Sequence, residues 1–423
     1  MKKTLLIILL LAASLSAQNI TLINTSHLDH LYDEVNVQGR KVGIVHIYSE
    51  YPDYQLVGDD DEGIACVDDA ARAAIFYLRY YKIKGDKELL RKAKQLIQFL
   101  LVMQSDSGFT NFIKDDFSRN TSGKTSVASS NWWTWRAMWA MSEAYSLLSV
   151  KTDSSYDRRL ADRTRRSLIR ALPLLKKMFT SYPATSAKEN VIMPQWLPHK
   201  CASDQAAVLI MALVPLFEKA KDNTLYDYIK KLAEGIMLMQ MGDKDNPPYY
   251  AHLSWENSWH AWGANQAEAL LRAGRSLNDK KMIQSALNEI DSFYDYLIEN
   301  QYLSSFVFEN RKMEKSERYP QIAYGFSPLI SACMLASEIT GDQKYAEKGA
   351  RIALWFAGDN PANAPIYDLS SGRVYDGING RTDLNRNSGA ESTIEALLAM
   401  LEIEKNPVAR GIVLERFNNN QGN

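Results

Sequence analysis

The sequence predicts an all-α protein, an (α/α)6 toroid of six helical hairpins with minor β-pieces in its long loops. Ala-rich helices that are apolar on most sides recur roughly every 60–70 residues along the chain. The first five are each followed by an amphipathic helix with a charged face. A helix that is apolar all round is buried, whereas an amphipathic helix lies on a surface. Each pair therefore predicts one inner and one outer helix of a ring.

The predicted inner helices share an apolar, Ala-rich composition and cover residues 66–82, 131–149, 203–220, 260–277, 321–340 and 387–405. Their amphipathic partners cover residues 86–104, 155–179, 224–241, 279–300 and 342–358. An Asp in the turns "KGDKE", "LNDKK" and "TGDQK" is expected to cap the outer helix that follows. The sixth outer helix is missing from this pattern. Residues 26–37, "SHLDHLYDEVNV", are predicted to supply it and to close the ring.

Strands are expected only in the connections. Residues 41–51, "KVGIVHIYSEY", alternate in a way that predicts a short strand. Further β-pieces are expected around residues 108–128, 302–320 and 363–384. Because no Pro/Gly/Ser linker or change of composition interrupts the repeat, residues 18–423 are predicted to form a single (α/α)6 catalytic-type domain.

The first residues, "MKKTLLIILLLAASLSAQ", combine two lysines, a short apolar core and small residues suited to cleavage. This pattern predicts a signal peptide over residues 1–17, which is too short to remain as a membrane-spanning helix. No later stretch is apolar for long enough to cross a bilayer. The mature protein is therefore expected to be periplasmic or extracellular, with no membrane insertion after the signal is cleaved.

Charge and cysteine usage exclude several function classes. Lys and Arg number 49 and Asp and Glu number 50, with no basic stripe, which argues against a nucleic-acid partner. Cys66, Cys201 and Cys333 are an odd number at wide spacing, so buried thiols are expected rather than a disulfide scaffold. Spacings of the CxxC or HExxH kind are absent from the sequence, so neither a metal nor a cofactor is expected. The oligomeric state is left open.

All inner helices of such a ring run the same way, so their amino ends meet on one face with their positive dipole ends and free N–H groups. The long connections precede the inner helices and lie on that face. One of them, "DDDEGIACVDDAARAAI" (residues 59–75), carries six carboxylates. Others are rich in Trp, as in "SSNWWTWR" and "YYAHLSWENSWHAWGANQ". Flat aromatic rings beside carboxylates and amides suit a sugar ring, so a carbohydrate is predicted as the ligand.

Four segments carry a resemblance to a known family: "DEGIACVDDAARAAIFYLRYY", "WRAMWAMSEAY", "WFAGDNPANAPIYDLSSGRVYDGI" and "LNRNSGAESTIEALLAML". The chain resembles bacterial all-helical proteins of the six-hairpin glycosidase superfamily over nearly its whole mature length. More narrowly, it resembles a group associated with glycosyltransferase-labelled proteins and mannoside-processing enzymes. The resemblance implies an (α/α)6 fold and carbohydrate processing.

Glycoside hydrolysis needs a pair of carboxyl groups, so acids at the predicted mouth are the catalytic candidates. Asp68 and Asp69 begin the first inner helix. Asp69 is the preferred candidate, because Asp68 has a local partner in Arg72 one turn on. Capping of the helix by one of the two Asp is the alternative. Glu391 begins the last inner helix, where a capping box with Ser388 is the alternative.

Glu256, flanked by Trp255, Trp259 and His260, is a further catalytic candidate. An acid among indoles would have a raised pKa, which suits a general acid. A rim Glu paired with Lys or Arg is the alternative. Glu143 is expected in a buried structural pair. The predicted substrate-binding residues are Asp61, Glu62, Trp132, Trp133, Arg136, Trp196, His199, Trp255, Trp259, His260, Tyr324, Asn385 and Asn387.

The leading hypothesis is thus a secreted glycoside hydrolase in which Asp69 acts with Glu256 or Glu391 on an oligo- or polysaccharide. A polysaccharide lyase or unsaturated-uronide hydrolase would instead use Arg136, Arg381 and Arg386 to bind uronates. A sugar epimerase would need a His, which His199 or His260 can supply. A glycan-binding protein without catalysis is the non-enzyme alternative, favoured by the lack of an acid in "ASSNWWTWRAMWA".

Overall fold

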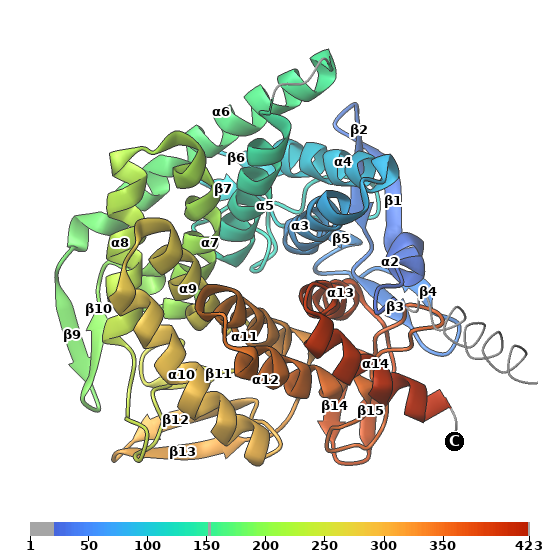
Figure 1. Cartoon of the computed structure of the whole chain (residues 1–423). Coiled ribbons are helices and arrows are strands. Elements are labelled where there is room, and N and C mark those ends of the chain that lie inside the picture. The colour runs from blue at the N-terminus through green and yellow to red at the C-terminus, as the bar shows by residue number, and fades with distance from the viewer. Residues whose placement is uncertain (1–20, 151–153, 422–423) are drawn as a thin grey trace, which may run out of the picture.

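A computed structural model describes residues 21–150 and 154–421 of the chain. The predicted signal peptide, residues 1–17, lies outside the described residues. The helices form a ring in which an inner layer surrounds the centre and an outer layer covers it (Figure 1). This is the predicted (α/α)6 arrangement, with each inner helix packed against the outer helix that follows it.

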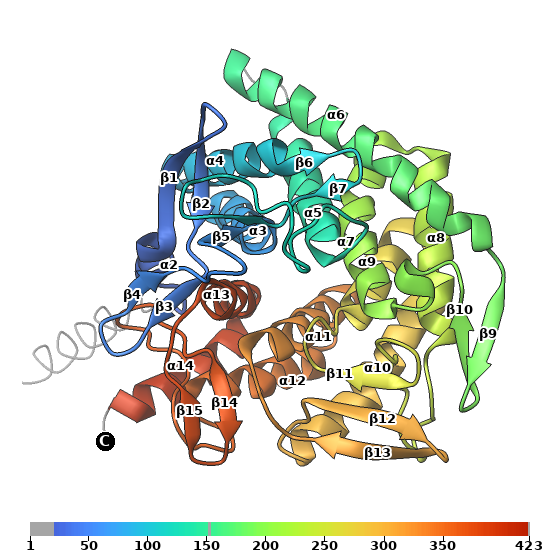
Figure 2. The same ribbon diagram turned by 180° about the vertical axis from the view of Figure 1, so that it is seen from behind.

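The inner helices are α3 (Val67–Lys84), α5 (Trp132–Leu148), α7 (Ser203–Ala220), α9 (Gln266–Leu277), α11 (Ser327–Thr340) and α13 (Ala390–Glu404). The outer helices are α4 (Lys87–Met103), α6 (Ser155–Met178), α8 (Asn223–Leu238), α10 (Lys280–Glu299), α12 (Gln343–Ala353) and α14 (Pro407–Gln421). Neighbouring inner helices pack in sequence order, and α13 returns to contact α3. Figures 1 and 2 both show α13 beside α3, so the ring closes between its last and first hairpins.

The turns between the paired helices follow the predicted chemistry. Asp86, Asp279 and Asp342 are the N-caps of α4, α10 and α12, and each side chain accepts a hydrogen bond from a backbone N–H of the next turn. Gly85 ends α3 and Gly341 ends α11, both in the left-handed conformation that glycine adopts at little cost. These short turns lie at the carboxyl ends of the inner helices and leave the long connections to the opposite face.

The prediction that residues 26–37 supply the sixth outer helix is wrong. Only α2 (Ser26–Leu31) is helical there, and β1 (Tyr32–Val37) follows it. The chain instead continues past α13 into α14, which begins at Pro407 after Asn406 has accepted hydrogen bonds from two backbone N–H groups of the first turn. The N-terminal segment covers the seam of the ring, because α2 contacts α13 and β2 (Arg40–Val45) packs on α3 and α4.

The remaining strands lie in the long connections, as expected for the three predicted regions. All pair antiparallel, mostly as short hairpins. They are β3 (Tyr48–Glu50), β4 (Gln55–Val57), β5 (Ala65–Cys66), β6 (Gln104–Ser105), β7 (Gly108–Phe109), β8 (Phe112–Ile113), β9 (Thr185–Lys188), β10 (Val191–Pro194), β11 (Ser258–His260), β12 (Ser305–Glu309), β13 (Lys312–Glu317), β14 (Gly377–Gly380) and β15 (Asp383–Asn385). The hairpin β9–β10 and strand β11 were not predicted. Strand β11 ends at His260, where the fourth inner helix was predicted to begin, and α9 begins six residues later, at Gln266.

The core follows from the inner helices, which are buried around most of their circumference. A buried ion pair crosses it: Arg79 Nη2 of α3 lies 2.6 Å from Glu143 Oε1 of α5, and the indole N–H of Trp139 donates to the same oxygen at 2.9 Å. Glu402 of α13 lies 3.8 Å from the guanidinium. The expected structural role of Glu143 is thereby confirmed. Among the described residues, no helix is both long and apolar enough to traverse a bilayer.

We expect the substitution Glu143→Gln to lower the free energy of unfolding at pH 7 by about 3 kcal/mol, because the buried Arg79 loses its main counter-ion. Urea denaturation followed by circular dichroism measures this change. The control is Asp227→Asn, which removes the exposed Lys231–Asp227 pair and should cost less than about 1 kcal/mol.

The pH dependence of that difference has a definite sign. Burial raises the pKa of Glu143, but the guanidinium of Arg79 outweighs it and holds the pKa at about 2. The stabilisation is therefore complete above the ordinary glutamate pKa of about 4.3 and is lost as the pH falls toward 2. The gap between wild type and Glu143→Gln should shrink below pH 4. A gap that stays constant from pH 7 to pH 2.5 would contradict this assignment.

Candidate active site

The amino ends of the six inner helices are joined on one face by side-chain contacts. The contacts are Arg72–Glu391 between α3 and α13, Asp68–Arg136 between α3 and α5, Trp135–Gln205 between α5 and α7, Ser203–Gln266 between α7 and α9, Asn265–Tyr324 between the residues that precede α9 and α11, and Ser327–Glu395 between α11 and α13. Each contact joins two neighbouring helices, so together they complete a circuit. The predicted convergence of the inner-helix amino ends is confirmed.

Arg72 is the centre of this face. Its guanidinium is buried and contacts four carboxylates: Asp69 Oδ1 at 2.7 Å, Asp68 Oδ2 at 3.2 Å, Glu391 Oε2 at 2.7 Å and Glu395 Oε1 at 3.0 Å. The two Asp precede Arg72 by one turn of α3, and the two Glu are one turn apart on α13, so each helix presents both of its acids on one side. We call these five residues the Arg72 cluster.

A second buried guanidinium supports the first. Arg136 of α5 donates to Asp68 and to the hydroxyl of Tyr324, and it lies over the ring of Trp132 at 5.3 Å. The guanidinium carbons of Arg72 and Arg136 lie 4.6 Å and 4.7 Å from the centre of the Tyr324 ring. Burial raises the pKa of Tyr324 to about 12, so its neutral hydroxyl accepts the hydrogen bond from Arg136. Arg136 was predicted to bind substrate, but its guanidinium is occupied by Asp68 and Tyr324.

The cluster holds ionised and protonated carboxyl groups together near neutral pH. Burial raises the pKa of Asp69 to about 6, with repulsion from Glu391 and Asp68 adding to it and Arg72 opposing it. Burial likewise raises the pKa of Glu395 to about 7. Burial acts on Asp68 too, but the attraction of Arg136 and Arg72 outweighs it and holds the pKa of Asp68 below its usual value. Neighbouring carboxyls with divergent pKa values are the arrangement that acid–base catalysis uses.

Solvent reaches this cluster at two of the four acids. The Glu391 side chain is 40% exposed and that of Asp68 is 18% exposed, whereas Asp69 and Glu395 are buried. Asp69, the preferred catalytic candidate, is therefore the less accessible of the two Asp, and it pairs with Arg72 as Asp68 does. Asp69 points inward because its carboxylate binds Arg72 and accepts from the thiol of Cys66 at 3.3 Å.

The acids are too close together for an inverting hydrolase. One oxygen each of Asp68, Asp69 and Glu391 lies within 4.8 Å of the others. Retaining glycosidases separate their two carboxyls by about 5–5.5 Å and inverting ones by about 6.5–9.5 Å. The observed spacing is nearer to the retaining value. Three such oxygens can also bind a metal ion, but the guanidinium of Arg72 contacts all three carboxylates and supplies the positive charge here.

None of the three acids caps its helix, contrary to the alternatives weighed from the sequence. The N-cap of α3 is Cys66, whose sulfur accepts from the N–H of Asp69 at 3.3 Å. The residue before α13 is Gly389, and its N–H donates to Asp376 Oδ1 at 2.8 Å, so no capping box with Ser388 forms. Because other groups satisfy these helix ends, the carboxylates remain available to Arg72.

Glu256 lies apart from the Arg72 cluster, on the turn before β11. Its carboxylate binds Lys188 of β9 at 2.6 Å, which is the rim pairing weighed against a catalytic role. The predicted pair of Asp69 with Glu256 is therefore not brought together. The preferred acids that the structure does bring together are Asp68, Asp69 and Glu391.

Three predicted sugar-binding tryptophans belong to the core. Trp133 donates its indole N–H to the carbonyl of Phe109 and Trp196 donates to that of Lys231, while Trp259 packs against aromatic rings of α10 and β12. All three are almost fully buried, so the expectation that they stack on a sugar is wrong. Trp132 is half-buried beside Arg136, and Trp255 and Trp262 are exposed.

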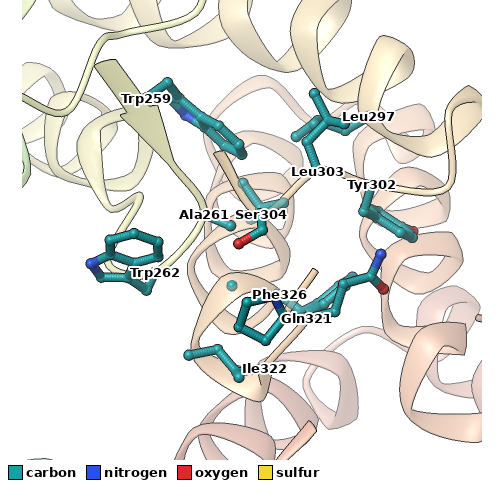
Figure 3. Close-up of a pocket in the computed structure, with 13 residues that line it drawn as sticks. Trp259, Ala261, Trp262, Leu297, Tyr302, Leu303, Ser304, Gln321, Ile322 and Phe326 are labelled. Carbon is teal, nitrogen blue, oxygen red and sulfur yellow. The ribbon is translucent and has the colours of Figure 1, made fainter. Parts of the chain in front are cut away.

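His260 and Trp262 form a second group on the same face. His260 Nε2 lies 3.0 Å from Asp204 Oδ2 of α7, and His260 Nδ1 lies 2.8 Å from the carbonyl oxygen of Trp262. Below Trp262 is an apolar cavity of about 30 Å³, room for about one water, lined also by Trp259, Tyr302 and Phe326 (Figure 3). This cavity is too small for a sugar.

The other predicted substrate-binding residues lie farther around the face. Asp61 and Glu62 line a polar hollow of about 740 Å³ with Lys114, Lys124 and Thr125. His199 is exposed in a separate hollow of about 340 Å³.

Asn385 and Asn387 shape the loop before α13, because Asn385 accepts from the N–H of Asn387 and Asn387 accepts from the N–H of Tyr51. The sequence did not predict Glu395 or Trp262 as site residues. It also did not predict that Arg72 binds four carboxylates. The one available signal was the spacing of four between Glu391 and Glu395, which places both acids on one side of a helix.

Comparison with known proteins establishes the fold. No protein-family profile and no curated protein sequence matches the chain. A sugar epimerase from a ruminal bacterium aligns over 90% of this chain and 95% of its own, with 15% identity and a TM-score of 0.60. Cellobiose 2-epimerase from Bacillus thermoamylovorans aligns over 89% and 95%, with 12% identity and a TM-score of 0.56.

An α-1,6-mannanase of Salegentibacter aligns over 85% of this chain and 92% of its own, with 11% identity and a TM-score of 0.50. That structure is of an inactive variant, with two adjacent Asp replaced by Ala, in complex with α-1,6-mannotetrose. At these identities the shared feature is the fold. The chain has the (α/α)6 fold of these proteins, as the sequence predicted.

The raised pKa of Glu395 predicts how stability changes with pH. Below the unfolded-state pKa of about 4.3 the protonated group contributes fully, and this contribution is lost as the pH rises through the folded-state value of about 7. Wild type should therefore lose on the order of 3 kcal/mol through this group between pH 4 and pH 8. Glu395→Gln cannot titrate and should lack that loss, as urea titrations across this pH range would measure.

Glu402→Gln on the same helix is the matched control with the opposite sign. Burial raises the pKa of Glu402, but Lys405 and Arg79 outweigh it and lower the pKa, so its contribution is lost as the pH falls. Identical pH profiles for wild type and Glu395→Gln would show that folding leaves the pKa of Glu395 at its ordinary value, against the arrangement described here.

Proposed function

We propose that this protein is a carbohydrate-active enzyme, and specifically a glycoside hydrolase that cleaves an oligo- or polysaccharide with the carboxyl groups of the Arg72 cluster. The single observation that carries the proposal is the pairing of a solvent-reachable acid, Glu391, with an ionised acid, Asp68, beside buried carboxyls that retain protons near neutrality. This pairing lies where the positive ends of six helix dipoles meet.

The chemistry follows from the charge of each acid. Cleavage of a glycosidic bond needs a proton for the leaving oxygen and a carboxylate to act on, or stabilise, the positive anomeric carbon. Asp68 is held ionised by Arg136 and Arg72, so it suits the nucleophile or charge-stabilising role. Glu391 reaches the solvent and lies within 4.8 Å of Asp69, whose pKa is about 6. In this proposal Asp69 supplies the proton, through Glu391, the neighbouring carboxyl group that solvent reaches.

Two observations support a carbohydrate substrate. Exposed indoles of Trp255 and Trp262 lie on the same face as the acids and offer flat surfaces for the C–H faces of sugar rings. The mannanase with the shared fold is inactive when two adjacent Asp are replaced, and this chain also has an adjacent pair, Asp68 and Asp69, at the start of an inner helix. We also propose that the mature enzyme acts in the periplasm or outside the cell, because residues 1–17 have the pattern of a signal peptide.

A sugar epimerase or isomerase is the second candidate. It is favoured by the pairing of His260 with Asp204, which resembles a base and its orienting carboxylate, and by the fold shared with sugar epimerases. Both ring nitrogens of His260 are already bonded, one to Asp204 and one to a carbonyl oxygen, so neither is free to take a proton from a sugar. The lyase alternative loses Arg136, which is buried and paired. Hydrolysis by the carboxyl groups is therefore preferred.

Activity of two variants tests the proposal. We expect Asp68→Asn and Glu391→Gln each to lower kcat/KM by about 10²–10⁴-fold, because each removes a carboxyl group that acts in the transition state. Release of reducing ends from α-1,6-mannotetraose and a panel of other oligosaccharides measures hydrolysis. Glu88→Gln, which changes an exposed acid on the outer helix α4, is the control and should act like wild type.

Proton magnetic resonance in deuterium oxide distinguishes the second candidate. An epimerase that works by proton abstraction would introduce deuterium at the sugar carbon that it inverts and release no new reducing end. That result, or full hydrolysis by both Asp68→Asn and Glu391→Gln, would overturn the proposed hydrolase.

A further inference from the structure

Trp262 is a large apolar side chain held rigidly at the surface. It is 43% exposed, and one face of its indole stacks on the imidazole of His260, with ring centres 4.0 Å apart and planes 8° apart. Isolated surface aromatics are common, but this ring is held by its stack on His260 while much of it stays exposed to solvent. Figure 3 shows Trp262 at the edge of the local side-chain group, on the far side from Leu297 and Tyr302.

His260 itself is locked in place from both ends of its ring. Its Nε2 binds the buried carboxylate of Asp204 at 3.0 Å, and its Nδ1 donates to the carbonyl oxygen of Trp262 at 2.8 Å. Asp204 lies in the first turn of α7, so the orientation of the imidazole is set by an inner helix. The imidazole in turn supports the indole. Asp204 thus orients His260, and His260 in turn holds Trp262 in place.

Gly263 follows Trp262 in the chain and lies beside residues that link it to the Arg72 cluster. This glycine has a φ of +72°. A Cβ added to it would lie 2.9 Å from both the Trp132 ring and the Tyr324 hydroxyl. Tyr324 accepts from Arg136, which binds Asp68. The backbone of Gly263 thus lies against Trp132 and Tyr324, which both contact Arg136, the partner of Asp68. A chain of contacts therefore runs from the residue next to Trp262, through Tyr324 and Arg136, to Asp68.

We propose that the outward face of Trp262 is a sugar-binding subsite, on which a pyranose ring stacks, and that His260 is its positioning residue. The identification of the ligand as a carbohydrate rests on the proposed function. A protein partner would need a broad apolar patch, whereas the rigid element here is one flat ring stacked on an imidazole. That size and chemistry fit one sugar residue of an oligosaccharide.

Binding measurements in the Glu391→Gln background test the subsite without turnover. The probes are α-1,6-mannotetraose and cellotetraose, with affinity measured by calorimetry. We expect Trp262→Ala to raise the Kd of the bound probe by about tenfold or more, and Trp262→Phe to restore most of the affinity by keeping a flat ring. Tyr226→Ala, which removes a similarly exposed aromatic from the outer helix α8, is the control and should bind like its parent.

A double-mutant cycle on the active enzyme tests the positioning role. If His260 acts through Trp262, His260→Ala raises KM and leaves kcat within about twofold, and it has no further effect once Trp262 is Ala. A large additional fall of kcat in the double variant would show instead that His260 takes part in the chemistry, and would overturn the positioning role.

The two proposals fail in distinguishable ways. Tight binding of a probe that weakens in Trp262→Ala, with no turnover by wild type, would retain the subsite and overturn the hydrolase. Hydrolysis by wild type with unchanged affinity and KM in Trp262→Ala would retain the hydrolase and overturn the subsite. If neither probe binds and wild type hydrolyses neither of them, both the hydrolase and the subsite are overturned.

Discussion

The burial of Arg72 is the constraint on which the rest of the site depends. A guanidinium taken out of water is costly unless opposite charges surround it, and no single helix offers enough of them. Arg72 draws two carboxylates from its own helix, α3, and two from α13, at the other end of the chain. The same ion pairs therefore neutralise a buried charge and tie the last hairpin to the first. The contacts that close the ring are therefore the same contacts that form the site.

The surplus of negative charge over positive charge gives this arrangement its chemical character. Four carboxyls face two guanidinium groups in a buried setting, so the deeper acids hold protons near neutrality while Asp68 stays ionised. Helix capping is left to Cys66 at α3 and to Asp376 at the loop before α13, which frees the carboxylates of the first turns. The positive ends of the inner helices favour the remaining negative charge at the mouth. These contacts therefore give a site that contains protonated and ionised carboxyl groups side by side.

The sequence predicted the ring because its signal is local and repeated. Apolar helices, their spacing and the capping Asp of the outer helices are each read within one segment, and the structure confirms them. The sixth outer helix was assigned to residues 26–37 instead of α14, although Asn406 and Pro407 carry a helix-start pattern.

The site was less predictable because its contacts are distant in sequence. The acids Asp68, Asp69 and Glu391 could be named, but that they share Arg72 depends on α13 returning to α3. The tryptophans show a second limit. Trp133, Trp196 and Trp259 belong to the core and Trp255 and Trp262 to the surface, and nothing in their local sequence separates the two groups. A ligand-facing ring is defined by what packs on its other side, and for Trp262 that is His260.

A crystal structure of the Glu391→Gln protein soaked with the oligosaccharide it binds best tests the central claim most directly. We expect ordered sugar over the amino ends of α3 and α13, with the anomeric carbon or glycosidic oxygen beside Asp68 and residue 391. Sugar bound instead in the hollow of Asp61 and Glu62, or on the outer helices, with the Arg72 cluster left covered by protein, would contradict it.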